Sequence, residues 1–142
     1  VEEVGDEVAA VIAFIMKCEK SGLLERVGVD RYKIQEIFDG LINAGLKEDR
    51  ILAIDQGWKL VGAIATTERR LASGRFLHGG SAMMAYCVGN AKVEAKGNNI
   101  IISKQIAGAS KIDPLMATFN AVSLMALNPA APGKKYEMFF VA

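Results

Sequence analysis

Asp113 is an acidic residue at the expected start of a strongly apolar helix, within the segment 111–117 (KIDPLMA). Proline is favoured at the first helical position, so Pro114 predicts that a helix begins here. A carboxylate before it has two chemical uses. It can cap the free backbone N–H groups of the first turn, or it can bind Mg²⁺ beside a helix N-terminus that also favours phosphate. The residue type alone leaves both uses open.

Two further acids, Asp30 and Asp55, follow short apolar segments, residues 23–29 and 50–54, that we expect to be strands. If these strands are parallel, their carboxyl ends meet at the sheet edge where ligands bind in such folds. Carboxylates are the ligands that hard cations prefer. Two Mg²⁺ or Mn²⁺ ions about 3.5–4 Å apart can hydrolyse a phosphodiester. Asp55 has an alternative role as a surface or capping residue.

The elements that must position these acids alternate along the chain. Residues 34–42 have the apolar spacing of a helix that Gly45 ends, and Gly22 ends a longer amphipathic helix before it. Helix, strand, helix and strand in this order predict a parallel βαβ unit. The apolar positions of the first helix are Val4, Val8, Val11, Ile12, Ile15 and Met16.

The second half of the chain predicts a helix and a turn within residues 62–80, a short helix at 81–88 and a hairpin of strands 91–95 and 99–104. A last helix runs from Pro114 to about Leu127, with four methionines assigned to the core. We expect one domain over residues 1–129. Residues 130–135 predict a linker, and residues 136–141 a final strand or a docking tail. The four methionines are Met83, Met84, Met116 and Met125.

The net charge of +1 hides an uneven distribution. Residues 1–61 carry 8 Lys+Arg and 12 Asp+Glu, whereas residues 62–111 carry 7 and 2. Clustered cations favour a polyanionic partner, although a solvated surface is an equal alternative. Among these cations, Arg69 and Arg70 can clamp phosphate through the guanidinium group. Lys104 and Lys111 flank the approach to Asp113. There they can steer DNA or favour the ionised form of the Asp113 carboxylate.

Other residue types narrow the class of protein. Cys18 and Cys87 lack the spacing of a metal site, so we expect reduced thiols. No apolar run reaches the roughly 20 residues of a membrane span, and nothing resembles a signal peptide, so we expect a cytoplasmic protein. There is no P-loop sequence for ATP. His78, the single histidine, is assigned a structural or phosphate contact in preference to a general base.

Six short blocks carry a family resemblance. Together and in this order they resemble the nuclease domain of tailed-bacteriophage terminase large subunits, over about residues 1–129. The resemblance implies a ribonuclease H-like α/β fold, with flanking helices, a mixed sheet and a hairpin. It also implies a divalent metal, Mg²⁺ or Mn²⁺, and cutting of concatemeric viral DNA during genome packaging. The blocks are VGVDRY (27–32), QGW (56–58), TTERRL (66–71), HGG (78–80), CVGNA (87–91) and KIDPLMA (111–117).

The resemblance implies roles for particular residues. Asp30 matches the acidic ligand at the end of the central strand, and Asp113 matches the ligand at the start of the last helix. The family's remaining acidic ligand lies on a first strand for which this sequence has no match. Double-stranded DNA, the portal and the small terminase subunit are the implied partners, in a bacterial cell that carries a phage or prophage.

A missing first strand has physical consequences. The neighbouring strand would expose unpaired backbone groups, which favours dimerisation or strand exchange. The loss of one carboxylate weakens metal binding, so we expect this fragment to have little or no nuclease activity on its own. The alternative is a non-catalytic DNA-binding or assembly module of a prophage remnant.

Overall fold

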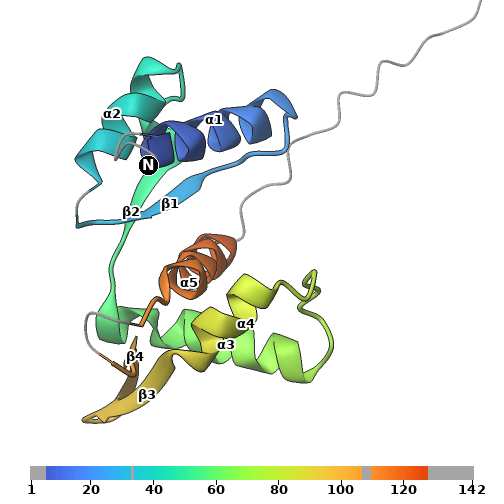
Figure 1. Cartoon of the computed structure of the whole chain (residues 1–142), viewed down its shortest axis with the longest axis vertical. Coiled ribbons are helices and arrows are strands. Elements are labelled where there is room, and N and C mark those ends of the chain that lie inside the picture. The colour runs from blue at the N-terminus through green and yellow to red at the C-terminus, as the bar shows by residue number, and fades with distance from the viewer. Residues whose placement is uncertain (1–5, 33, 107–109, 128–142) are drawn as a thin grey trace, which may run out of the picture.

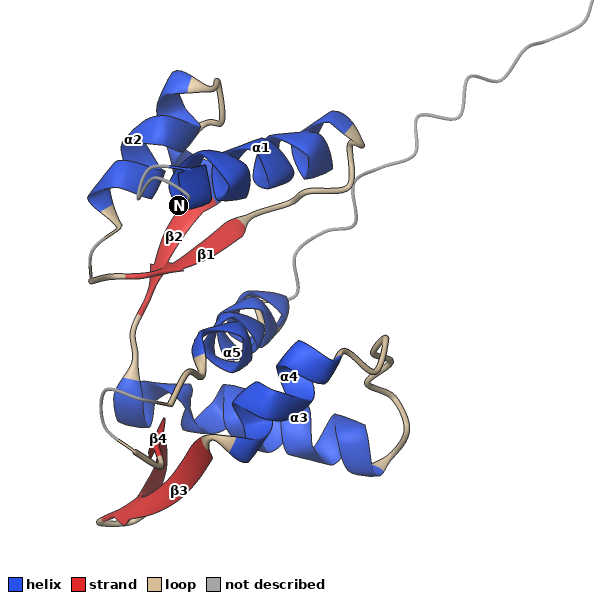
Figure 2. Cartoon of the chain, viewed as in Figure 1, coloured by secondary structure: helices blue, strands red, loops and turns tan. Residues whose placement is uncertain are grey.

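The structure is a computed structural model that describes residues 6–32, 34–106 and 110–127 (Figure 1). Helices and strands alternate in the first half of the chain, and the hairpin separates the last two helices (Figure 2). The predicted linker 130–135 and the apolar segment 136–141 lie outside the described residues. The helices are α1 (Asp6–Lys20), α2 (Gln35–Asn43), α3 (Val61–Ala72), α4 (Ala82–Gly89) and α5 (Asp113–Met125), and the strands are β1 (Val27–Asp30), β2 (Ile51–Ile54), β3 (Ala91–Lys96) and β4 (Asn99–Lys104).

Strands β1 and β2 form the predicted parallel pair. Val27 is opposite Ile51, and Asp30 is opposite Ile54. The helices α1 and α2 lie on one side of this pair and α5 lies on the other (Figure 1). Gly28 permits the close approach of α5, because a Cβ atom there would lie 3.0 Å from a methyl group of Leu124. The βαβ unit predicted from the apolar spacing is therefore confirmed.

The hairpin β3–β4 forms a second, antiparallel sheet. Beside it, a cluster of buried side chains joins α3, α4, α5 and the 3₁₀ turn Gly57–Leu60. Ile100 and Ile102 of β4 pack against this cluster. None of the helices within the described ranges is long and apolar enough to span a membrane. The buried cluster consists of Leu60, Ala63, Ile64, Cys87, Leu115 and Phe119.

Two local predictions were wrong. Residues 23–26 precede β1 as a loop instead of extending the strand. The guanidinium of Arg50 donates hydrogen bonds to the carbonyl groups of Leu24 and Glu25, so these carbonyls are not available to a neighbouring strand. Met83 and Met125, which we assigned to the core, are 64% and 58% exposed, because both occupy outward positions on their helices.

Candidate functional site

Asp30 and Asp55 lie at the same edge of the parallel pair, one at the end of β1 and the other directly after β2. The Asp30 side chain is exposed. Its Oδ1 atom accepts a hydrogen bond of 3.0 Å from the backbone N–H of Tyr32, a turn that fixes the carboxylate at the strand end. The predicted meeting of two acids at this edge is thus present.

The carboxylate of Asp55 is held by two cations. Arg31 lies 3.2 Å from Oδ1, and the Lys59 ammonium donates to Oδ2 at 2.7 Å. The hydrogen bond from Lys59 is the largest cause that lowers the pKa of Asp55, and the charge of Arg31 lowers it further. Both oxygens are therefore engaged in surface ion pairs, which is the alternative to metal ligation that the sequence left open.

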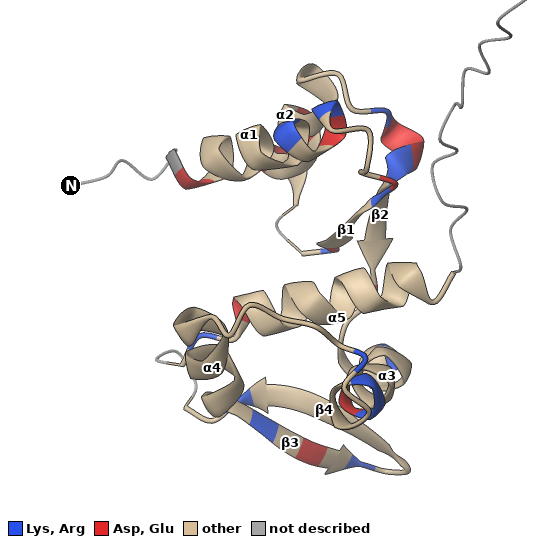
Figure 3. Cartoon of the chain, turned by 90° about the vertical axis from the view of Figure 1, so that its right-hand side faces the viewer, with Lys and Arg blue, Asp and Glu red and all other residues tan. Residues whose placement is uncertain are grey.

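The helix α5 crosses the parallel pair obliquely, with its C-terminal part beside the middle of β1 and its middle beside the end of β2 (Figure 3). Leu124 packs against Gly28, two residues before the end of β1. The side-chain amide of Gln56 donates both to the Ile54 carbonyl and to the Asn120 side chain, each at 3.0 Å, and so ties the end of β2 to the middle of α5. The N-terminus of α5 consequently lies at the end of the molecule to which the strands point their carboxyl ends.

Asp113 is the first residue of α5 and is exposed. It precedes Asn120 by seven residues, which is about 10 Å along a helix axis. The capping position is occupied by Ile112, and no side-chain hydrogen bond caps this helix. The capping role that the sequence allowed for Asp113 is therefore not observed. Asp30, Asp55 and Asp113 all lie toward the same end of the fold.

The carboxylate oxygens at this end are the type of ligand that a hard divalent cation prefers, but there are too few of them for a two-metal centre. In the part of the chain that the structure describes, no group of three or more His, Cys, Asp and Glu side chains can hold a metal ion. Asp30 and Asp113 are the two exposed carboxylates free of the ion pairs that engage Asp55.

Asn90 brings the two predicted lysines into one neighbourhood. Its carbonyl accepts a hydrogen bond of 2.9 Å from the N–H of Gln105, the residue after Lys104. Its side-chain amide donates at 3.1 Å to the carbonyl of Lys111. Both lysines are exposed, and Lys111 is two residues before Asp113. These contacts place a basic pair beside the start of α5.

Arg69 and Arg70 form a second basic group, in the last turn of α3. Sequence reasoning missed a third member, Arg75. Its N–H donates to the Arg70 carbonyl at 2.8 Å, which folds the loop back over the end of α3. With Ser73, the three arginines line an open pocket of about 600 Å³. Figure 3 shows that the charged residues of the second half lie on α3, on the hairpin and in the loops, whereas α5 carries charge only at its start.

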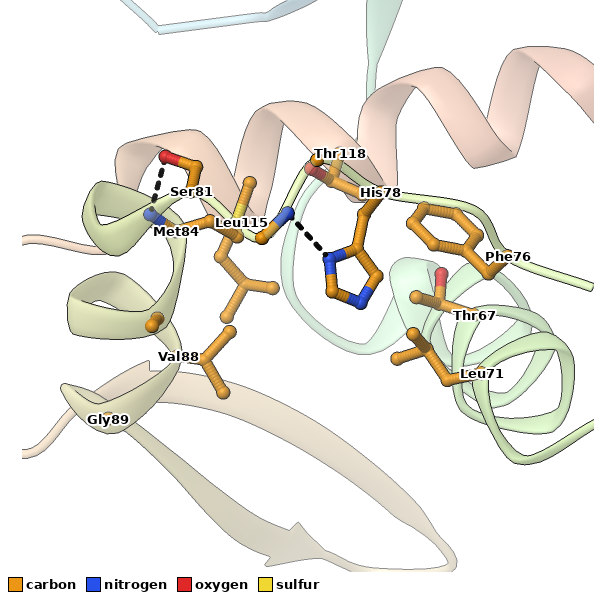
Figure 4. Close-up of a pocket in the computed structure, with 13 residues that line it drawn as sticks. Thr67, Leu71, Phe76, His78, Ser81, Met84, Val88, Gly89, Leu115 and Thr118 are labelled. Atoms are coloured by element: carbon orange, nitrogen blue, oxygen red, sulfur yellow. Dashed lines mark hydrogen bonds between the residues drawn. The ribbon is translucent and has the colours of Figure 1, made fainter. Parts of the chain in front are cut away.

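The structure does not bring the four predicted cations into one cluster. Arg70 lines a cavity with Ala126, at the C-terminal end of α5, whereas Lys111 precedes its N-terminal end. The 13 residues of α5 separate the groups by about 20 Å. His78 is exposed, and its Nδ1 atom accepts a hydrogen bond of 3.2 Å from the N–H of Gly80, which favours a structural role (Figure 4).

Comparisons with known proteins bear on the fold. No family model matches the sequence, and no curated protein matches it either. Among solved structures, the crystal structure of the HK97 bacteriophage large terminase matches with a TM-score of 0.68 and 24% sequence identity. The match covers 82% of this chain, and the chain spans 24% of that terminase. The fold is therefore that of a part of a phage large terminase, and the α/β fold class implied by the sequence resemblance is confirmed.

Proposed function

We propose that this chain is a nuclease portion of a phage-type terminase large subunit, and that it acts on double-stranded DNA with Mg²⁺ or Mn²⁺. The observation that carries the proposal is the structural match to the HK97 large terminase over 82% of the chain. The exposed acids Asp30, at the end of β1, and Asp113, at the start of α5, support the proposal as candidate metal ligands. Cutting of concatemeric DNA during packaging is the activity we propose for the complete protein.

Asp30 and Asp113 would hold the metal, because both are exposed carboxylates at the ends of elements that pack together. A bound divalent cation would stabilise the negative charge that develops on a phosphate. Water and phosphate oxygens would complete the coordination, since the described residues offer no group of three His, Cys, Asp and Glu side chains. We therefore expect weak metal binding and little or no cleavage by the isolated chain.

The two basic groups suit one DNA duplex. They are separated by the length of α5, about 20 Å, which is roughly six nucleotide steps along a DNA strand. Lys104 and Lys111 would contact the backbone near Asp113, while Arg69 and Arg70 would contact it farther along. Phosphate contacts of this kind fix the position of a duplex without reading its sequence.

The partners and location follow from the same proposal. The portal and the small terminase subunit would bind the complete protein in the cytoplasm of a bacterial host that carries the phage or prophage. The parallel pair β1–β2 has no third strand within the ranges that the structure describes. An open sheet edge favours pairing with another chain, so homodimerisation through this edge is part of the proposal.

Metal titration tests the enzymatic part of the proposal. Mn²⁺ binding to the whole chain, followed by electron paramagnetic resonance, should weaken on Asp30→Asn and on Asp113→Asn. Asp55→Asn is the matched control, because that carboxylate is held by Arg31 and Lys59. Equal Mn²⁺ affinity in all four proteins would contradict a role for Asp30 and Asp113 as ligands.

The second candidate function is a non-catalytic DNA-binding or assembly module. It is favoured by the lack of a three-residue metal group among the described residues. DNA cleavage in Mn²⁺ separates the two functions. Robust cutting that Asp113→Ala abolishes would exclude the non-catalytic module and would also contradict the expectation of weak activity. DNA binding without metal dependence, unchanged by Asp30→Asn, would favour the module.

A further inference from the structure

A largely apolar groove lies between α3, α4, α5 and the loop after α3. Its main cavity has a volume of about 680 Å³ and is lined by side chains that include Leu71, Phe76, Met84 and Leu115 (Figure 4). A second cavity of about 320 Å³ shares Phe76 and Thr118 with the first and continues along α5 to Ala126. The groove thus follows α5 from its first turn to its C-terminal end.

The surface around this groove has the composition of a binding interface. Residues 76–91 contain no Asp, Glu, Lys or Arg, although charged residues make up 23% of the chain. Leu77 is 92% exposed, Met83 64% and Tyr86 57%. Depletion of charge together with exposed Met and aromatic side chains is typical of the centre of a protein interface. Something apolar is therefore expected to cover this surface.

The chain itself continues from the end of the groove. Ala126 lines the second cavity, and after Leu127 the chain continues as residues 128–142 with the sequence NPAAPGKKYEMFFVA. This segment, which lies outside the described residues, has an apolar end in YEMFFVA (136–142). Eight residues, 128–135, precede it and can span up to about 26 Å. The distance back along α5 from Ala126 to Thr118 is only about 12 Å.

We infer that residues 136–142 bind in this groove of the same chain, with Phe139 and Phe140 in the main cavity. Each Phe side chain can bury about 150–250 Å², and cavities of about 300–1,000 Å³ commonly hold ligands of this size. Covalent attachment favours this occupant over a free partner, because a short linker gives an effective concentration in the millimolar range. The inference does not depend on the proposed nuclease function.

Methionine methyl resonances test the inference in the whole chain. Met84 lines the main cavity and Met125 the second, whereas Met16 lies on α1. In protein labelled with ¹³C at the methionine methyl groups, the double substitution F139S/F140S should shift Met84 and Met125 and leave Met16 unchanged. The matched control K134S/K135S changes the same segment outside its apolar end and should leave all three resonances in place. Unchanged Met84 and Met125 in F139S/F140S would overturn the inference.

A synthetic peptide of residues 128–142 provides the second measurement. Added to the F139S/F140S protein, the peptide should return the Met84 methyl resonance to its wild-type position. We expect a Kd of about 0.1 mM or below, which is at least tenfold lower than the effective concentration of the covalently attached segment. Leu71→Ser in the cavity wall should weaken this binding about tenfold, whereas Leu23→Ser, at an exposed leucine in the loop before β1, should not. Equal effects of the two substitutions would overturn the assignment to the groove. If the Met84 methyl resonance of the wild-type protein shifts with protein concentration, a second copy of the chain occupies the groove. That result would overturn the intramolecular contact.

Discussion

The two halves of the molecule are stabilised by different interactions. In the half formed by α1, α2, β1 and β2, two arginines are paired with acids: Arg50 lies 2.6 Å from Glu19, and Arg31 lies 3.2 Å from Asp55. The half formed by α3, α4, α5 and the hairpin contains the buried cluster. Its arginines at positions 69, 70 and 75 have no ion pair with any residue that the structure describes.

The difference shows where each half can bind a charged partner. Paired cations in the first half have already lost part of their attraction for an external anion, whereas the arginines at the end of α3 keep theirs. The helix α5 joins the halves, because Leu115 and Phe119 belong to the buried cluster while Leu124 packs on β1. Asp30 ends β1 in the first half, and Asp113 begins α5, the helix that joins the two halves.

The largest effect is expected from Phe119→Ala, which removes a side chain that is 5% exposed from the buried cluster. Loss of a buried Phe costs about 3–5 kcal/mol of unfolding free energy, measurable by urea denaturation. Leu23→Ala, at a side chain that is 78% exposed in the loop before β1, is the control and should cost less than about 0.5 kcal/mol. Because α5 joins the halves, amide exchange in Val27–Asp30 should also accelerate in Phe119→Ala. Unchanged protection of β1 would show that the halves unfold independently.

A smaller loss is expected from Arg50→Ala, which tests the polar stabilisation of the first half. The guanidinium pairs with Glu19 and donates to the carbonyls of Leu24 and Glu25 from a partly buried position. Hydrogen bonds to a charged group of this kind suggest a loss of about 1–3 kcal/mol, measured by urea denaturation. Arg26→Ala is the matched control, because Arg26 is an exposed arginine in the loop 23–26 that Arg50 contacts. An equal loss of unfolding free energy in both variants would show that the contacts of Arg50 do not stabilise the first half.

The order of helices and strands could be predicted from the sequence because it depends on local apolar spacing. The predicted strand at residues 23–29 was too long because its first carbonyls bond to Arg50, about 25 residues away. Periodicity also failed to show that Met83 and Met125 face outward, since α4 and α5 are apolar around most of their circumference.

The carboxylates of the candidate site could be found from the sequence because each lies at the end of a strand or at the start of a helix. Their assignment as metal ligands stays a prediction. Arg75 could not be found, because a loop turn and its bond to the Arg70 carbonyl bring it beside α3. Lys104 and Lys111 were expected to flank the approach to Asp113, but the two contacts of Asn90 that bring them together depend on the fold and could not be found from the sequence.

A modest effect is expected on DNA binding from the unpaired arginines. If Arg70 contacts a phosphate, Arg70→Gln should weaken binding to duplexes of any sequence and reduce the slope of log K against log[salt] by about 0.9. Fluorescence anisotropy at several salt concentrations measures this slope. Arg31→Gln is the matched control, because the Arg31 guanidinium is paired with Asp55. An equal change of slope in both variants would contradict the contrast between paired and unpaired arginines.

The smallest effect is expected from the ion pairs of Asp55, which are partly exposed. The pKa of Asp55 is lowered in the folded protein, first by the Lys59 hydrogen bond and then by the charge of Arg31. A lowered folded pKa stabilises the protein at pH values above the unfolded pKa of about 3.9, and this contribution is lost as the pH falls through the folded pKa. The difference in urea midpoint between wild type and Asp55→Asn should therefore be constant from pH 7 to about pH 5 and vanish in stronger acid.

Two further substitutions sharpen this prediction. Because Lys59 is the largest cause of the lowered pKa, Lys59→Met should remove more of the acid dependence of the urea midpoint than Arg31→Met. Both changes delete one positive charge, so a general effect of net charge would alter the two variants equally. A stability difference for Asp55→Asn that persists unchanged below the folded pKa would show that Asp55 stabilises the sheet edge through contacts other than its charge.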